Sequence, residues 1–442
     1  FCARSTQSSK KGRASKYRVS STTTSLSFVA VNDMGVLTFT RTQKNYGKFY
    51  LRSNPFPHAG IPEENPGFCA DREKELASIS ETILTSLDGH SVHMALLGGY
   101  GNGKTHTLKY VKSEINRQLN GNGNARALAS FVMTPGLSFV DLYRNFMQDL
   151  GRDFFLDRVW ELLGTIAVEE IERRKKAFQN LNREVKQRIR NNPKIIREYV
   201  DEGTVLLSSL TKAYREKLLS IVKSVDVVNA FLQLLAEETS LLAWKWISGE
   251  QTMHEQRKEI GVVSAINTDD KALSVFLGVK SILRELGYRA LCLLVDEFEN
   301  IETLFPQQKQ RFLNSIRHLI DLNPTGLCLI ISCTPEVWKT IVREYHAFSE
   351  RIFKEVLLKP LNEATLRNLI AEYVQRHRTG QNGGIGQLYP FSDDSIRPLL
   401  EFSQGNMRRA LSICNISIDI ATETNSETIT GDFLKTALER LS

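Results

Sequence analysis

The strongest chemical signal in the sequence is an octapeptide with the spacing GxxxxGK[ST], Gly98-Gly99-Tyr100-Gly101-Asn102-Gly103-Lys104-Thr105. It lies between a short apolar run and a helical pattern, where glycines let backbone N–H groups surround phosphate oxygens at a helix N-terminus. We expect Lys104 to reach the β- and γ-phosphates of a nucleotide and the Thr105 hydroxyl to ligate Mg²⁺. The candidate cofactor-binding residues are Gly98, Gly99, Gly101, Asn102, Gly103, Lys104, Thr105 and His106, with a structural role as the alternative for His106.

A pair of acids supplies the second half of this chemistry. The apolar run 291–295 predicts a buried strand, and Asp296 and Glu297 follow it directly. In parallel sheets, ligands bind at the carboxyl ends of the strands. We expect Asp296 to hold Mg²⁺, mainly through water, and Glu297 to polarise the attacking water as general base. Glu299 is the second candidate for the role of Glu297.

The next apolar run, 327–332, also ends in polar residues. A side chain at this strand end could touch the γ-phosphate, and we choose Thr334 for that role, with Ser332 second. The alternative is that this segment only caps the helix that follows it.

The elements that must position these residues follow from the hydrophobic pattern. Short apolar runs at 93–97, 127–133, 291–295 and 327–332 alternate with helical segments, which predicts a parallel sheet covered by helices. Residues 153–262 are helical by pattern and far exceed an ordinary crossover, so we interpret them as an insertion. Residues 360–442 contain no clear strand and predict a small helical domain.

The centre of this insertion is strongly basic. Residues 171–198 carry ten Lys or Arg against three Glu. One interpretation is a solvated helical face, and the other is contact with the DNA backbone. For the second, the candidate contact residues are Arg173, Arg174, Lys175 and Lys176.

Composition excludes several other classes of protein. The chain has 442 residues, of which 41% are hydrophobic and 24% charged, with a net charge of +7, so it is expected to bury full cores. Its six cysteines show no CxxC spacing, which argues against a zinc site or disulfide framework. No apolar stretch is long enough for a membrane helix, and we expect a cytoplasmic protein without membrane contact. Residues 1–45 are interpreted as a basic, disordered arm.

The order of these motifs resembles that of AAA+ ATPases, across residues 46–152 and 263–442. Asn54-Pro55-Phe56 with Phe68…Arg72-Glu73 looks like the entry segment of the replication-initiator (origin-recognition) clade, which packs near the adenine and adds Arg72 to the cofactor site. Ser349-Glu350-Arg351-Ile352-Phe353 resembles that clade's arginine-finger segment, which places Arg351 in a neighbour's site. Gly405-Asn406-Met407-Arg408-Arg409 resembles its lid motif, with Arg408 as second sensor. The resemblance implies ATP and Mg²⁺ as cofactors and a homo-oligomer.

A looser resemblance concerns the insertion. Trp244-Lys245-Trp246-Ile247-Ser248-Gly249-Glu250 and Gly287-Tyr288-Arg289-Ala290 look like ATP-binding proteins of BREX-type phage-defence systems. We therefore expect an α/β AAA+ base (46–152 and 263–359), a basic helical insertion (153–262) and a helical lid (360–442). The expected function is an ATPase that oligomerises with ATP and acts on DNA in phage defence, with partner proteins of the same operon. A DNA-loaded regulator of transposition or replication and a signalling scaffold without DNA contact remain alternatives.

Overall fold

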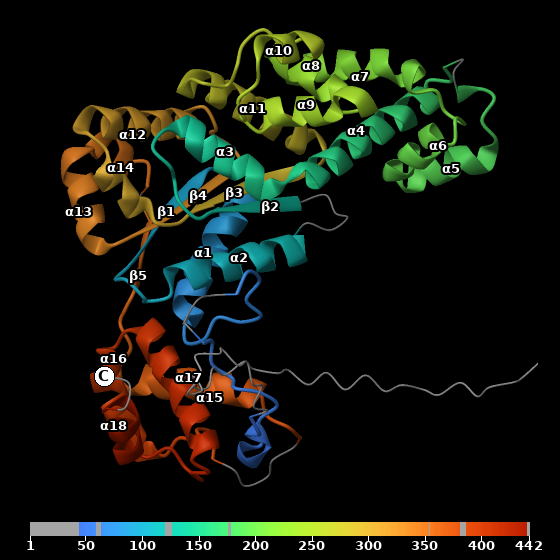
Figure 1. Cartoon of the computed structure of the whole chain (residues 1–442). Coiled ribbons are helices and arrows are strands. Elements are labelled where there is room, and N and C mark those ends of the chain that lie inside the picture. Colours follow the sequence, from blue (N-terminus) through green and yellow to red (C-terminus); the bar gives the residue numbers. More distant parts are fainter. Residues whose placement is uncertain are drawn as a thin grey trace, which may run out of the picture.

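The computed structural model describes residues 44–58, 63–119, 126–175, 178–352, 354–380 and 386–439. The basic arm therefore lies outside the described residues except for Lys44 and Asn45. Figure 1 shows three parts: a sheet with helices on both faces, a helical layer above it that extends to one side, and a bundle of helices below it.

The sheet has five parallel strands in the order β2-β3-β4-β1-β5. Their bounds are β1 Val92–Gly98, β2 Arg126–Val132, β3 Tyr288–Val295, β4 Leu327–Cys333 and β5 Lys354–Leu358. β4 thus separates the strand that leads into the glycine loop from the strand that ends at Asp296. The carboxyl ends of all five strands meet at one edge, and β5 is an additional edge strand that the apolar runs did not predict.

Helices cover both faces of this sheet. One face is packed by α1 (Glu73–Leu87) and α2 (Lys104–Leu119) through a core that contains Ile83, Leu108 and Leu294. The opposite face is packed by α3, α11, α12 and α13, which span Phe139–Leu150, Asp269–Glu285, Pro306–Asp321 and Pro335–Glu344. Short helices η4 (Phe298–Thr303) and α14 (His346–Ser349) complete the base.

The segment between α3 and α11 is helical, as its pattern predicts. It contains α4 Arg152–Glu172, α5 Arg183–Asn191, η3 Pro193–Ile195, α6 Ile196–Asp201, α7 Leu207–Ile221, α8 Val225–Gln233, α9 Glu237–Ile247 and α10 His254–Glu259. Its apolar residues belong to the same core as those of α3 and α11. The insertion is therefore an extension of one face of the base rather than a separately packed body.

The C-terminal bundle has a core of its own. Its helices are α15 Glu363–Arg376, η5 Asp393–Ser395, α16 Ile396–Ser403, α17 Met407–Glu423 and α18 Gly431–Glu439. The core of this lid also includes Phe49, Leu51 and Phe56, from the N-terminal segment that contains η1 (Tyr46–Phe49). The blue N-terminal segment accordingly lies against the lid in Figure 1. The expected fold class, an α/β base with a helical insertion and a helical lid, is confirmed.

Candidate functional site

The glycine loop joins β1 to α2, as the motif predicts. Gly98 is the last residue of β1 and Lys104 is the first of α2. Gly101 and Gly103 have φ angles of 76° and 90°, a region that residues with a Cβ rarely adopt. The loop therefore depends on these two glycines to bend its backbone toward the N-terminus of the helix.

Lys104 is buried inside this loop. Its Nζ donates a hydrogen bond of 2.8 Å to the carbonyl oxygen of Gly98, and lies 3.9 Å from a carboxylate oxygen of Glu299. Lys104 and Thr105 both line a cavity beside this loop. His106, the next residue, donates from Nε2 to the carbonyl oxygen of Phe68 at 2.8 Å. Burial lowers the pKa of His106, and its contact with Phe68 ties α2 to the N-terminal segment.

Asp296 lies at the carboxyl end of β3 and is almost fully buried. Its Oδ1 accepts a hydrogen bond from the hydroxyl of Ser332 on β4. Its Oδ2 is buried without a hydrogen-bond partner among the described residues, although Asp296 lines the cavity. An unsatisfied buried carboxylate oxygen is costly unless a cation or water meets it. Asp296 and the Thr105 hydroxyl therefore fit Mg²⁺, which typically takes one or two protein oxygens together with phosphates and water.

Glu297 differs from Asp296 in both exposure and backbone. Its side chain is exposed, and its φ and ψ of 47° and 39° are left-handed, which is uncommon for a residue with a side chain. Its carboxylate accepts from the amide of Asn300 at 3.3 Å, and that amide also reaches the hydroxyl of Thr134 at 3.2 Å. Asn300, which the sequence did not single out, thus holds Glu297 at the mouth of the cavity.

Glu299 is a third acid in the cavity. Its Oε1 lies near Lys104, while its Oε2 is buried and has no hydrogen-bond partner in the described ranges. Burial raises the pKa of Glu299, and the charge of Lys104 opposes that shift. Glu299 therefore faces the loop lysine, whereas Glu297 faces outward.

Thr334 and Ser332, the two candidates for contact with the γ-phosphate at the end of β4, lie in different surroundings. The Thr334 hydroxyl caps α13 by accepting from the backbone N–H of Val337 at 3.5 Å, and Thr334 is not among the residues that line the cavity. Ser332, the second choice, is the residue that contacts Asp296. The geometry thus gives Thr334 the capping role and brings Ser332 to Asp296.

The cavity has a volume of about 480 Å³ and is lined by three parts of the chain. The glycine loop and the acids form one part, and the lid residues Met407 and Arg408 form another. The third part is aromatic: Phe56 stacks on Tyr373 with ring centroids 5.5 Å apart, and Phe68 meets Tyr373 edge-on at 4.8 Å. Flat apolar rings next to a phosphate-binding loop suit a nucleotide, whose base can stack while its phosphates meet the backbone.

Arg72 connects the base, the loop and the lid. Its guanidinium donates to the carbonyl oxygens of Asn102 in the loop, at 3.2 Å, and of Lys359 just before the lid, at 3.3 Å. It is buried and also lines the cavity. Arg72 thus holds the backbone of the loop at Asn102 and joins it to the segment before the lid.

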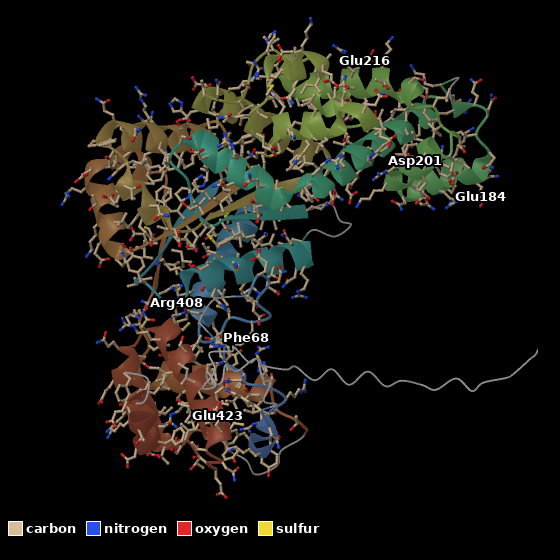
Figure 2. All side chains as sticks on the ribbon, in the orientation of Figure 1. Phe68, Glu184, Asp201, Glu216, Arg408 and Glu423 are labelled. Carbon is tan, nitrogen blue, oxygen red and sulfur yellow. The ribbon has the colours of Figure 1, made fainter. Side chains whose placement is uncertain are left out.

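The lid contacts the loop directly. The backbone N–H of Arg408 donates to the carbonyl oxygen of Gly101 at 3.1 Å, and the exposed side chain of Arg408 borders the cavity. Figure 2 shows Arg408 and Phe68 at the junction between the base and the lid. The loop residues from Gly103 to His106 together with Gly101, the three acids and Arg408 therefore line one cavity, whereas Gly98, Gly99 and Asn102 are not among its lining residues.

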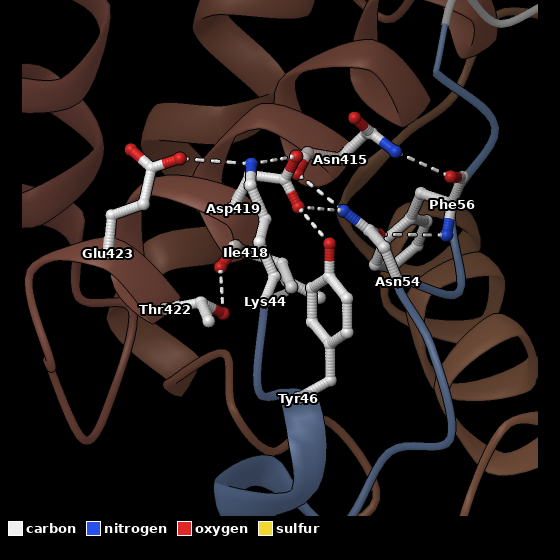
Figure 3. Close-up of polar contacts among 9 residues, drawn as sticks. All are labelled: Lys44, Tyr46, Asn54, Phe56, Asn415, Ile418, Asp419, Thr422 and Glu423. Atoms are coloured by element: carbon white, nitrogen blue, oxygen red, sulfur yellow. Dashed lines mark hydrogen bonds and ion pairs between the residues drawn. The ribbon is translucent and has the colours of Figure 1, made fainter. Parts of the chain in front are cut away.

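A set of contacts that the sequence did not reveal holds the N-terminal segment on the lid. Asp419 of α17 accepts from Lys44 at 2.7 Å, from the hydroxyl of Tyr46 at 2.8 Å and from the amide of Asn54 at 2.8 Å (Figure 3). The amide of Asn415 donates to the carbonyl oxygen of Phe56 at 2.6 Å. We call residues 44–58 the strap. It carries one aromatic wall of the cavity and is fixed to the lid.

Arg351 and the basic residues lie away from the cavity. Arg351 is half-exposed between α14 and β5, and its Nε donates to Asp321 at 2.9 Å. Arg173 pairs with Glu170 at 3.3 Å, while Arg174 is exposed with a φ of 54°. Lys175 pairs with Glu170 at 3.9 Å, and Lys176 lies outside the described residues.

Among the described helices, none is long and apolar enough to span a bilayer.

Comparison with solved structures gives several proteins of low sequence identity, among them ORC and Cdc6 proteins. The ORC2 protein of Aeropyrum pernix has 10% identity and a TM-score of 0.46, over 87% of this chain and 71% of that one. Cdc6p from Pyrobaculum aerophilum has 12% identity and a TM-score of 0.44, over 86% and 70%. Drosophila ORC bound to DNA has 12% identity and a TM-score of 0.44, over 98% and 71%.

The family comparison is more direct. No curated protein sequence matches the chain. The family model described as BREX system ATP-binding protein BrxC/D matches residues 57–368, from the strap to the first helix of the lid. This match covers well over half of the chain and confirms the resemblance drawn from its sequence, so the chain belongs to the BrxC/D family of BREX system ATP-binding proteins.

Proposed function

We propose that the chain is an ATP-hydrolysing AAA+ switch of BREX phage defence, which assembles with ATP and acts on DNA. One observation carries the ATPase: Lys104, Thr105 and Asp296 line a single cavity, in which an oxygen of Asp296 is buried without a hydrogen-bond partner among the residues that the structure describes. The description of the family, which names both ATP and BREX, supports the same conclusion.

Each residue of the cavity has a distinct task in this proposal. The loop amides and Lys104 bind the β- and γ-phosphates. The aromatic rings of Phe56 and Phe68 pack against the adenine ring of the nucleotide. Thr105 and Asp296 would hold Mg²⁺, which neutralises phosphate charge when bound. Phosphoryl transfer passes through a loose transition state, so positioning and charge compensation contribute most of the catalysis.

Glu297 is the proposed general base. It is exposed at the cavity mouth, where a water molecule can reach it, and Asn300 limits its rotation. It would accept a proton from the attacking water. Glu299 is less suited to that task because its carboxylate faces the charged Lys104 and is less exposed to water than that of Glu297.

Assembly completes the proposed site. Arg351 of one protomer would approach the phosphates bound by the next, and Arg408 of the lid would contact them within its own chain. Hydrolysis would then remove the charge that holds both arginines and reset the assembly. We place this cycle in the cytoplasm, on DNA, with partner proteins encoded in the same operon.

Steady-state ATP hydrolysis with Mg²⁺ tests the central step. Lys104→Ala is expected to abolish nucleotide binding, and Glu297→Gln to retain binding but lower kcat at least about 100-fold. Lys112→Ala, on the same helix but bonded to Asp149, is the matched control and should hydrolyse ATP normally.

Two results would contradict this assignment. Full turnover by Glu297→Gln together with loss of turnover by Glu299→Gln would move the base to Glu299. Absence of hydrolysis by the wild-type chain, with ATP bound and DNA present, would leave a nucleotide-dependent scaffold instead of an enzyme.

A further inference from the structure

Two groups of positive charges at the outer end of the insertion differ in their surroundings, and in the first group each cation has a partner on the protein. The partnered cations are Arg173 with Glu169 and Glu170, Lys175 with Glu170, Lys194 with Glu161, Arg197 with Asp201, and Arg188 over the ring of Tyr199. A cation compensated by a nearby carboxylate attracts phosphate less strongly. This group therefore does not favour an anion-binding surface.

The second group consists of Arg183, Lys186 and Arg190 on α5. None of the three forms an ion pair with a carboxylate in the part of the chain that the structure describes. Lys186 donates to the backbone carbonyl of Gln179 at 3.2 Å, and Arg183 and Arg190 are exposed. We call these three cations the α5 face.

Helical geometry places the three side chains on one flank of α5. Their spacing is i, i+3 and i+7, so they follow one another along the helix. Ile189 is the buried residue of α5 and fixes which side faces the core. Glu184 falls on the opposite flank, and Figure 2 shows Glu184 and Asp201 at the outer end of the insertion, on the side of the molecule away from the lid.

This arrangement is unfavourable for the isolated chain. Like charges three or four residues apart on a helix repel each other and destabilise it. At the end of α4, by contrast, Glu170 compensates both Arg173 and Lys175. The α5 face lacks that compensation, which points to a partner that supplies negative charge.

The spacing of the charges indicates the kind of partner. From Arg183 to Arg190 the helix rises about 10 Å, at 1.5 Å per residue. One strand of a DNA duplex advances about 3.4 Å per phosphate, so this length matches about three phosphates along its axis. The face consists of Arg and Lys side chains, which are common donors to the phosphate oxygens of DNA.

We propose that the α5 face is the surface by which the chain binds the phosphate backbone of double-stranded DNA, without regard to sequence. The proposal rests on the proposed action on DNA and moves the contact from residues 173–176 to α5. Arg174 lies beside this face, because Gln179 joins the two: its amide donates to the carbonyl oxygen of Arg174, and its own carbonyl oxygen accepts from Lys186.

The test compares two triple variants with the same change in charge. Arg183→Gln/Lys186→Gln/Arg190→Gln removes the α5 face, and Arg173→Gln/Lys175→Gln/Arg197→Gln removes three partnered cations as the matched control. Binding of a fluorescent duplex is measured by anisotropy between 50 and 200 mM salt, with ATP present. The α5 variant should have a log–log salt slope flatter by about 2.7, since each lost contact contributes about 0.9. The wild-type affinity would then fall about 40-fold more than the variant's over this range.

The control triple should change this slope by less than about 0.9, the contribution of one phosphate contact. Equal flattening of the slope by both triples would overturn the assignment of DNA binding to the α5 face, and would favour an attraction between DNA and the net positive charge of the insertion. An unchanged slope in the α5 variant would place the DNA contact elsewhere. Wild-type protein that hydrolyses ATP but binds no duplex at low salt would overturn both the surface and the action on DNA, while leaving the ATPase. Single variants Arg183→Gln and Arg190→Gln, each expected to flatten the slope by about 0.9, keep the test valid if the triple folds poorly.

Discussion

The side-chain amide of Asn406, at the N-terminus of α17, donates a 2.6 Å hydrogen bond to the carbonyl oxygen of Tyr100 in the glycine loop. The neighbouring Arg408 adds a backbone hydrogen bond to Gly101. The lid therefore contacts the backbone of the loop itself, so a change in loop conformation is expected to change the position of the lid.

The first prediction concerns Gly101. A Cβ at this position would lie 2.4 Å from Oδ1 of Asn406, and its φ of 76° is strained for any residue with a side chain. We expect Gly101→Ala to weaken ATP binding about 10-fold or more, because left-handed strain alone costs about 1–2 kcal/mol. Isothermal titration with a non-hydrolysable nucleotide would measure this loss.

The matched control is Gly89→Ala. Gly89 has a φ of 99°, yet no atom lies within 4 Å of its Cβ position. This variant should lose stability without losing nucleotide affinity. Equal affinities for Gly101→Ala and the wild type would contradict the close packing of lid and loop.

The second prediction concerns the strap. Asp419 joins Lys44, Tyr46 and Asn54 to α17, as Figure 3 shows. Asp419→Ala removes the acceptor shared by three donors and should lower the free energy of unfolding by about 2 kcal/mol. It should also weaken nucleotide binding, because Phe56 on the strap forms part of the cavity wall. Urea unfolding and nucleotide titration would measure the two effects.

Glu423→Ala serves as the control for the strap. Glu423 is exposed and pairs with Lys44 at 3.0 Å, an interaction worth less than about 1 kcal/mol. If both variants lost the same stability and neither lost nucleotide affinity, the strap would be only a surface attachment.

How much of this site the sequence could predict depends on the range of each interaction. The glycine loop, the Asp296–Glu297 strand end and the lid helix that begins at Met407 depend on local patterns, and the structure places them around one cavity. β5 was missed because it is a five-residue edge strand whose burial alternates, so it presents no apolar run. The contact between Asp419 and Lys44 joins residues 375 positions apart, and no local signal encodes it.

The choice between Thr334 and Ser332 shows a second limit. Both residues lie near the end of the same strand, and side chains two positions apart share a face of a strand. Thr334, however, lies beyond the last residue of β4 and begins the next helix as its cap. Which hydroxyl meets Asp296 depends on the register of β3 against β4, in which Val295 pairs with Ile331. The sequence alone does not specify that register.

The third prediction tests whether Arg351 acts between protomers. Arg351→Ala and Lys104→Ala proteins should each be nearly inactive, because one lacks the finger and the other the phosphate-binding lysine. Mixed together, they should regain part of the activity at interfaces that pair an intact loop with an intact Arg351. The measurement is the ATPase rate of the mixture against that of each variant alone.

Arg343→Ala is the control for this experiment. Arg343 is exposed on α13 and pairs with its neighbour Glu344, so its loss should leave hydrolysis unchanged. A mixed oligomer that forms but regains no activity would argue against action in trans. It would leave Arg351 with its intramolecular partner Asp321.

The fourth prediction is a dependence of stability on pH. His93 is buried in β1, where its Nδ1 accepts the backbone N–H of Leu329 at 3.3 Å. Burial, together with the nearby charge of Lys280, lowers the pKa of His93 to about 4. In the unfolded chain a histidine titrates near 6.5, so between these two values the unfolded state binds a proton that the folded state does not. The stability that His93 contributes is therefore present above pH 6.5 and is lost as the pH falls toward 4.

Urea unfolding of the wild type and of His93→Gln at pH 7.5 and pH 4.5 would measure this effect. The free energy of unfolding of the wild type, relative to that of His93→Gln, should fall by about 2–3 kcal/mol between the two values, since each pKa unit corresponds to about 1.4 kcal/mol. His254→Gln, at an exposed position on α10, is the matched control and should follow the wild type at both pH values. A constant difference between the wild type and His93→Gln would mean that His93 binds its proton equally well in the folded and unfolded states, so that its burial does not exclude the charged form.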